Sequence, residues 1–133
     1  MIKNLAIIFV LFLSVSCVKD VPEEQTVPSF VESNSSVIVG AEGNFNFGNS
    51  SISLYNPKDS TLLQNVYEKA NGKRLGDVLQ SAFIVADKVY LVVNNSSKIE
   101  IVRRSDFVSI GKIPGFTSPR YFLPVSNKKA YVT

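Results

Sequence analysis

Two internal similarities constrain the fold of this chain more than any other feature of its sequence. Lys88–Val92 (KVYLV) resembles Lys129–Thr133 (KAYVT), which lies 41 residues further along the chain. In a second register, Ser50–Tyr55 (SSISLY) resembles Ser97–Val102 (SKIEIV), 47 residues further along. A repeat of about 40–50 residues that contains four short strands is typical of a β-propeller blade. The alternative is a meandering β-sandwich in which the similarity is accidental.

From Ser36 onward the chain consists of short alternating or β-branched runs separated by turn residues, a pattern that predicts strands. A short helix between Glu68 and Leu79 is an alternative, but Asn71-Gly72 and Gly76 argue against it because they are turn signals. The predicted fold class is therefore all-β, a β-propeller. Closed propellers need about four to eight blades and only about two and a half fit here, so we expect residues 36–133 to be the N-terminal blades of a propeller truncated at its C-terminus. The predicted strands are Val37–Gly40, Ser51–Tyr55, Leu62–Tyr67, Val78–Val85, Lys88–Val93, Lys98–Val102, Phe107–Ile113, Tyr121–Val125 and Lys129–Thr133.

The first 16 residues have the pattern of an export signal. Lys3 supplies a positive start, and Leu5–Leu13 is an apolar run of nine residues, too short for a spanning helix, which needs about 20. Ser14-Val15-Ser16 then precedes Cys17, the only cysteine, in the manner of a lipobox. We therefore predict a lipoprotein signal peptide over residues 1–16 and lipidation of Cys17, whose acyl chains would anchor the protein. An ordinary cleaved signal peptide is the alternative.

Residues 17–35 read as a flexible tether after the lipidated cysteine, because they contain prolines and serines without hydrophobic periodicity. The lysine and acidic residues of Val18–Glu24 resemble the surface-export signal of some Gram-negative lipoproteins. This resemblance implies an outer-membrane, lipid-anchored protein exposed at the cell surface. A merely solvated tether is the alternative.

The composition excludes several classes of function. The chain has no histidine, which excludes the Ser-His-Asp triad, the Cys-His dyad and histidine-ligated metals. A single cysteine cannot form an internal disulfide or a Cys-x-x-Cys site. The net charge of +3 is scattered along the chain, so no nucleic-acid surface is expected. We therefore expect a protein without catalytic activity, metal or cofactor.

Four segments resemble the YncE-like β-propeller lipoproteins of gut-type Gram-negative bacteria: Glu42–Phe45, Asn71–Gln80, Tyr90–Glu100 and Ser118–Tyr121. Members of that family are seven-bladed propellers with no established catalysis. The best understood of them capture vitamin B12 at the cell surface and pass it to a TonB-dependent transporter. The resemblance therefore implies seven blades when complete, a corrinoid ligand and a TonB-dependent partner. A structural or interaction protein without a small-molecule ligand is the alternative.

Propeller geometry predicts which loops share a face. Successive turns of a blade alternate between the two ends of the ring, so residues 41–49, 71–77, 94–97 and 114–119 should meet at one end. Aromatic faces ringed by amide groups suit a large planar or sugar-bearing ligand. The turns at the opposite end are short and charged, and we expect them to be solvated. The candidate ligand-binding residues are Asn44, Phe45, Phe47, Arg74, Asp77, Asn94, Asn95, Phe116 and Arg120.

Several of these residues also fit a structural role. Phe45 and Phe47 alternate, so they could pack on one face of an extended hairpin. Asn94-Asn95 is a common turn pair, because asparagine tolerates left-handed backbone conformations. Arg120, near the start of a strand, could form an ion pair instead of contacting a ligand.

Overall fold

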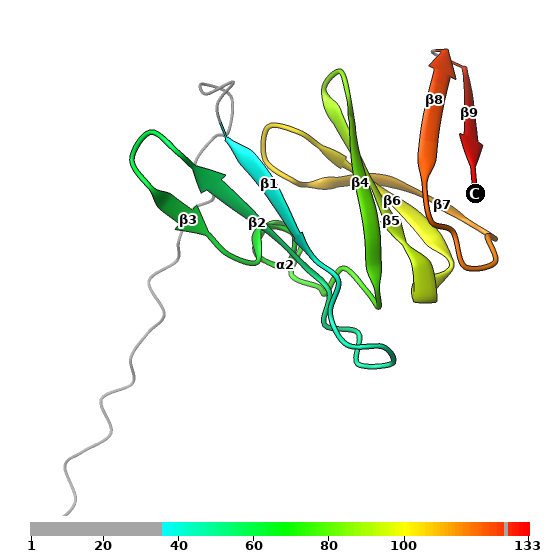
Figure 1. Ribbon diagram of the computed structural model, residues 1–133, viewed down its shortest axis with the longest axis horizontal. Helices are drawn as coiled ribbons and strands as arrows, with labels where there is room; N and C mark the ends of the chain where they lie inside the picture. Colours follow the sequence, from blue (N-terminus) through cyan, green and yellow to red (C-terminus); the bar gives the residue numbers. More distant parts are fainter. Residues whose placement is uncertain (1–35, 127) are drawn as a thin grey trace, which may run out of the picture.

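The computed structural model describes residues 36–126 and 128–133, which form three antiparallel β-sheets (Figure 1). The strand orders are β1-β2-β3, β4-β5-β6-β7 and β8-β9. The prediction of an all-β chain is therefore confirmed. The predicted signal peptide, the predicted lipidation site Cys17 and the predicted tether lie outside the described residues. The elements are β1 (Val37–Ala41), β2 (Ser51–Asn56), β3 (Thr61–Leu63), α2 (Val66–Asn71), β4 (Leu79–Val85), β5 (Lys88–Val93), the 3-10 turn η2 (Asn94–Ser96), β6 (Lys98–Arg103), β7 (Ser109–Pro114), β8 (Phe122–Ser126) and β9 (Lys129–Val132).

The central sheet, β4 to β7, is a four-stranded meander in which each strand pairs with the next along the chain. It contains four of the predicted strands in their predicted order. Two of these strands begin later than predicted, at Leu79 and at Ser109. Val78 and Phe107 have positive φ values of 61° and 58°, which an extended strand does not accommodate. Each therefore lies in the turn that precedes a strand.

Both sequence registers correspond to equivalent strands in the structure. β2 lies 47 residues before β6, and each of the two strands follows the loop that connects it to the preceding strand of its sheet. β8 and β9 form a hairpin like that of β4 and β5: Val85 faces Lys88 in one, and Ser126 faces Lys129 in the other. A bulge between Pro124 and Ser126 shifts the pairing of the second hairpin. The repeat is thus one of paired strands as well as of residue types.

The segment after β3 differs from the prediction. Leu62–Tyr67 was expected to be a strand, but β3 ends at Leu63 and the helix α2 begins at Val66. The Asn71-Gly72 pair does not prevent this helix; it ends it. Gly72 adopts φ 62° and its N–H donates to the carbonyl of Glu68 at 2.8 Å, which is a normal glycine C-cap.

The core divides into two unequal hydrophobic clusters on the two faces of the central sheet. The larger cluster joins β2 and α2 to one face and includes Leu54, Leu91 and Phe107. On the other face, Val92, Ile99 and Phe122 are buried together. β4 lies between β1 and β8 in the resulting row of sheets (Figure 1). No helix in the described part of the chain is long and apolar enough to cross a membrane.

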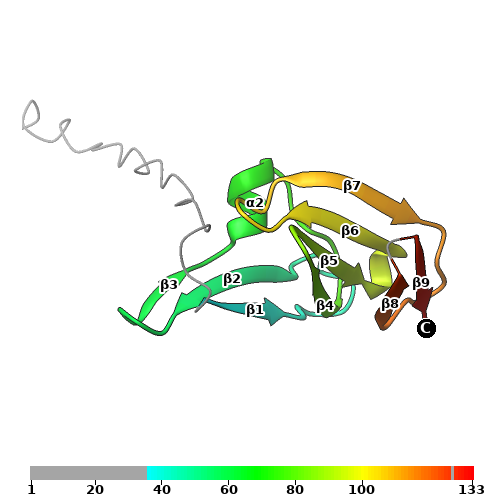
Figure 2. The same cartoon turned by 90° about the horizontal axis from the view of Figure 1, so that it is seen from above.

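The helix α2 lies beside β6 and β7 (Figure 2), and a buried polar cluster fixes it against the central sheet. Glu100 of β6 is 2% exposed, and its carboxylate accepts hydrogen bonds from the Tyr67 hydroxyl at 3.0 Å, Ser109 Oγ at 2.6 Å and Lys98 Nζ at 2.8 Å. Burial alone would raise the pKa of Glu100, but the hydrogen bonds from Lys98 and Ser109 and the Lys98 charge outweigh it, so this pKa lies below its usual value. Burial and the nearby Glu100 charge raise the pKa of Tyr67.

Candidate functional site

Four loops meet at one end of the row of sheets and form what we call the loop rim: residues 42–50, 72–78, 94–97 and 115–120. Side-chain hydrogen bonds connect them directly. Asn95 joins the third loop to the first and second, because its Nδ2 donates to Asn46 Oδ1 at 2.9 Å and to Asp77 Oδ2 at 2.5 Å. Asn94 Nδ2 donates to the Pro119 carbonyl at 3.0 Å and so reaches the fourth loop. The structure therefore brings together the loops that strand alternation placed at one end.

Asp77 is the centre of these contacts. Its Oδ2 accepts from the backbone N–H of Asn46 at 2.8 Å as well as from Asn95, and its own N–H donates to Ser96 Oγ at 2.9 Å. The residue is 9% exposed. Its second oxygen, Oδ1, is buried and has no hydrogen-bond partner within residues 36–126 and 128–133. Asp77 thus holds three rim loops in place, a role that the sequence did not indicate when it suggested Asp77 as a ligand-binding residue.

Close packing makes this arrangement specific for glycine at two positions. Gly76 has φ 140°, and a Cβ there would lie 2.6 Å from Ser96 Oγ. Gly43 has φ 80°, and a Cβ there would lie 2.7 Å from the backbone nitrogen of Ser50. Such distances are shorter than normal contacts, and these φ values disfavour any side chain. The rim is therefore a tightly packed scaffold.

Phe45 and Phe47 project from this scaffold into solvent. Their side chains are 63% and 69% exposed, so the alternative in which they pack within a hairpin is wrong. A turn carries them: the Phe47 N–H donates to the Asn44 carbonyl at 3.1 Å, and Asn46 between them has φ 68°. Asn49 Oδ1 accepts from the Asn44 N–H at 2.8 Å and fixes the base of the turn. The structure presents two exposed aromatic side chains on a hydrogen-bonded loop.

The remaining predicted residues do not converge on this pair. Arg74 is exposed in the second loop, and Arg120 is exposed in the fourth. The described residues contain two ion pairs, Lys98–Glu100 and Arg103–Asp106, so the expected ion pair of Arg120 is not among them. Phe116 packs against the smaller core cluster instead of joining Phe45 and Phe47. The amides of Asn94 and Asn95 are occupied in the rim, which agrees with their structural alternative.

The opposite end of the sheets contains the short turns. Arg103 pairs with Asp106 across one turn, and the N–H of Arg104 donates to the Asp87 carbonyl at 2.8 Å. Arg103 and Asp87 are exposed. This end offers charged groups but no exposed aromatic cluster among its described turns.

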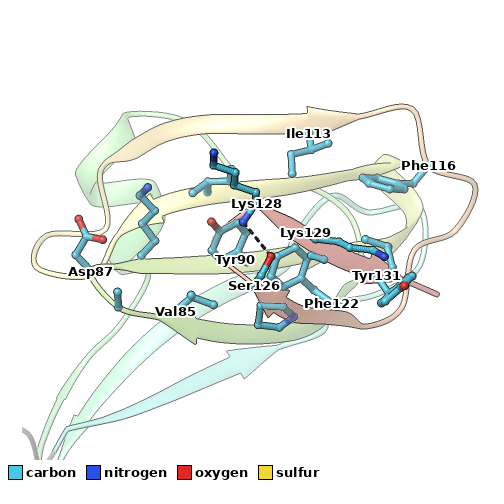
Figure 3. Close-up of a pocket in the computed structure, with 16 residues that line it drawn as sticks. Val85, Asp87, Tyr90, Ile113, Phe116, Phe122, Ser126, Lys128, Lys129 and Tyr131 are labelled. Carbon is cyan, nitrogen blue, oxygen red and sulfur yellow. Dashed lines mark hydrogen bonds between the residues drawn. The ribbon is translucent and has the colours of Figure 1, made fainter.

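A groove of about 770 Å³ lies between the central sheet and the β8–β9 hairpin, and it extends from Phe116 of the rim to the turns at Asp87 and Lys128 at the opposite end (Figure 3). Its floor includes the stacked rings of Tyr90 and Phe122, whose centroids are 4.4 Å apart. Ile101, Ile113 and Tyr131 form part of its walls. No motif in the sequence pointed to this groove, because its walls come from strands far apart in the chain.

The geometry defines an all-β protein that is built from repeated antiparallel strand units and has a loop rim held together by side-chain hydrogen bonds. Residues 36–133 match the family described as "Domain of unknown function (DUF5074)". The chain belongs to this family. No curated protein matches the sequence.

Proposed function

We propose that this chain forms part of a YncE-like β-propeller, a non-catalytic surface lipoprotein that binds a large ligand through the loop rim. The propeller is supported by the four-stranded meander β4–β7, flanked by equivalent strands on both of its faces. Four-stranded antiparallel units arranged side by side are the building blocks of propellers. Seven blades in the complete ring remain an implication of the family resemblance.

The observation that carries the binding proposal is the exposure of Phe45 and Phe47 on a loop held by Asp77. Exposed large aromatic side chains on rigid loops are common anchors in binding sites, and immobilising them in advance lowers the entropic cost of association. Arg74 adds a cationic donor to the same rim. A planar, polar ligand would stack on the rings and use the arginine and backbone groups for orientation.

A corrinoid is the specific ligand that we propose, by resemblance to the family members that capture vitamin B12. In this reading Cys17 anchors the protein in the outer membrane, the tether extends the propeller from the surface, and a TonB-dependent transporter receives the ligand. No metal or other cofactor belongs to the protein itself in this proposal.

Isothermal titration calorimetry of the full chain with cyanocobalamin and with cobinamide tests the proposal. We expect Phe45→Ala to weaken binding about ten-fold or more, since a buried aromatic contact is worth about 1–3 kcal/mol. Arg104→Ala, at the opposite end, is the matched control and should leave the affinity unchanged. If neither ligand gives a heat of binding, the corrinoid assignment is refuted. If Arg104→Ala weakens binding and Phe45→Ala does not, the binding site lies at the end opposite the loop rim.

A second candidate is a surface protein whose rim contacts another protein or a glycan. It is favoured by one observation: Asn94 and Asn95 already donate their amide hydrogens within the rim, which leaves mainly apolar chemistry exposed at Phe45 and Phe47. A photo-crosslinking residue at position 47 in intact cells separates the candidates. Capture of a TonB-dependent transporter supports the first, and capture of an adhesin or a glycan supports the second.

A further inference from the structure

The short turns at the end opposite the loop rim carry an excess of positive charge. Residues 56–61, 86–88, 103–106 and 128–129 contain six cationic and three acidic residues, whereas the loop rim contains three cationic and two acidic residues. We call this group of four turns the basic end. Its cationic residues are Lys58, Lys88, Arg103, Arg104, Lys128 and Lys129.

Carboxylates of the described part of the chain neutralise little of this charge. Two ion pairs occur there, and only one of them, between Arg103 and Asp106, lies at the basic end. The side chains of Lys58, Lys128 and Lys129 are exposed to solvent. Exposed cations of this kind attract an anionic partner, because the field of one surface adds over all of its charges.

Three of the four turns lie next to one another. Lys88 is opposite Arg103 in the pairing of β5 with β6, and the N–H of Arg104 donates to the Asp87 carbonyl at 2.8 Å. Asp87 and Lys128 both line the groove between the central sheet and the β8–β9 hairpin (Figure 3). Cationic residues from three separate turns therefore share one surface.

The chain also enters the described fold at the basic end. Val37, the first residue of β1, pairs with Tyr55 of β2, and Asn56 pairs with Thr61 across the turn that follows β2. From there β1 runs to the loop rim, which begins at Glu42 (Figure 1). The segment that precedes β1 therefore joins the fold beside the basic end, and the loop rim lies at the other end of the strands.

We propose that the basic end rests on an anionic lipid surface whose headgroups carry phosphate, and that the loop rim faces away from this surface. The inference rests on the surface lipoprotein proposed above, because acyl chains on Cys17 would bring the membrane to the end at which the chain enters. A lipid anchor and a basic patch act together in membrane binding: the acyl chains enter the bilayer, and the cations attract anionic headgroups. This orientation leaves Phe45 and Phe47 accessible to a ligand.

Co-sedimentation with lipid vesicles tests this assignment. The full chain, in a Cys17→Ser background that cannot be acylated, is mixed with vesicles of phosphatidylcholine and with vesicles of phosphatidylcholine and phosphatidylglycerol in equal amounts. The apolar run Leu5–Leu13 contributes to both partition coefficients, so their ratio reports the electrostatic attraction alone. One lysine near an anionic surface raises the affinity about five-fold. We therefore expect Lys128→Gln to lower the ratio by about this factor, and the addition of Lys129→Gln to lower it again by a similar factor.

The matched control is Lys73→Gln, which removes the same charge from an exposed position of the loop rim. The seven residues of β4 separate that loop from the basic end and span about 20 Å, more than twice the Debye length of about 8 Å at physiological salt. Lys73→Gln should therefore change the ratio by less than about two-fold. Lys128→Arg keeps the charge and should keep the ratio of the wild type.

The proposal is overturned if the chain partitions equally into both kinds of vesicle, or if Lys128→Gln and Lys73→Gln lower the ratio to the same extent. The second result would mean that the attraction depends on net charge and not on the basic end. If the two kinds of vesicle differ only after Glu23 and Glu24 are replaced by glutamine, acidic residues of the chain itself occupy the basic end instead of lipid. The experiment contains no corrinoid and no acylated cysteine, so the failure of either of those proposals leaves its result unaffected.

Discussion

Replacing Glu100 by glutamine should destabilise the fold more than any other single change of charge in the described residues. The carboxylate accepts three hydrogen bonds while 2% exposed. Hydrogen bonds to a buried charge contribute about 1.5–3 kcal/mol, and loss of one partner of a buried pair costs about 3–5 kcal/mol. Lys98 keeps some contact with solvent at 20% exposure, so we expect Glu100→Gln to lower the free energy of unfolding by about 2–4 kcal/mol.

The pH dependence of stability provides a second, independent readout. Because the pKa of folded Glu100 is depressed, its contribution is present above the pKa of the unfolded residue, about 4.3. It is lost as the pH falls through the lower folded value. Wild-type stability should therefore decline below about pH 4.3 with a component that Glu100→Gln lacks.

Urea unfolding followed by far-ultraviolet circular dichroism, from pH 7 down to pH 3, measures both effects. Tyr67→Phe removes one donor to Glu100 and should cost about 1–2 kcal/mol. Glu68→Gln makes the same chemical change as Glu100→Gln at an exposed position of α2 and should shift stability by less than about 0.5 kcal/mol. If Glu100→Gln has the same urea midpoint as the wild type and loses stability at low pH in the same way, the cluster does not stabilise α2 against the sheet.

Three other predictions follow from the described packing and the sequence. Gly76→Ala should lower the free energy of unfolding by about 1–3 kcal/mol, because its Cβ would meet Ser96 Oγ at 2.6 Å; Gly48→Ala, in open space at φ 60°, should cost no more than about 1 kcal/mol in the same urea titration. Phe45→Ala should change stability by less than about 0.5 kcal/mol, and a loss above 2 kcal/mol would mean that the ring packs within the fold. Metabolic labelling with a palmitate analogue should mark the wild type, and equal labelling of Cys17→Ala would end the lipidation hypothesis.

Strand positions were predictable because they depend on local patterns. Lys88–Val93 was placed at its observed bounds, since its alternation of residues and the turns at either end are local signals. The helix α2 was missed for the same reason. Its stability comes from Tyr67, which bonds Glu100, 33 residues away, and no local propensity reports such a contact. The Asn71-Gly72 pair was interpreted as a turn signal against a helix, whereas Gly72 is the C-cap that ends α2.

The candidate site was also predictable only in part. Strand alternation alone predicted that the four loops would share one end, and their hydrogen bonds meet there. Whether each side chain faces solvent depends on its neighbours in space. Phe45 and Phe47 are exposed while Phe116 is partly buried, although all three lie in loops of similar composition. Sequence patterns could not distinguish these environments.

By itself, the sequence determined the all-β class, the repeat and its two registers, and the grouping of the loops, because strand periodicity and turn chemistry act between near neighbours. Only the tertiary structure decided that Asp77 ties the rim together, that Glu100 is buried beneath Tyr67, and that a groove lies beside Phe122. Each of these depends on which strands stack face to face. Burial and electrostatic environment are properties of that stacking, so they arise only once residues distant in the chain are packed together.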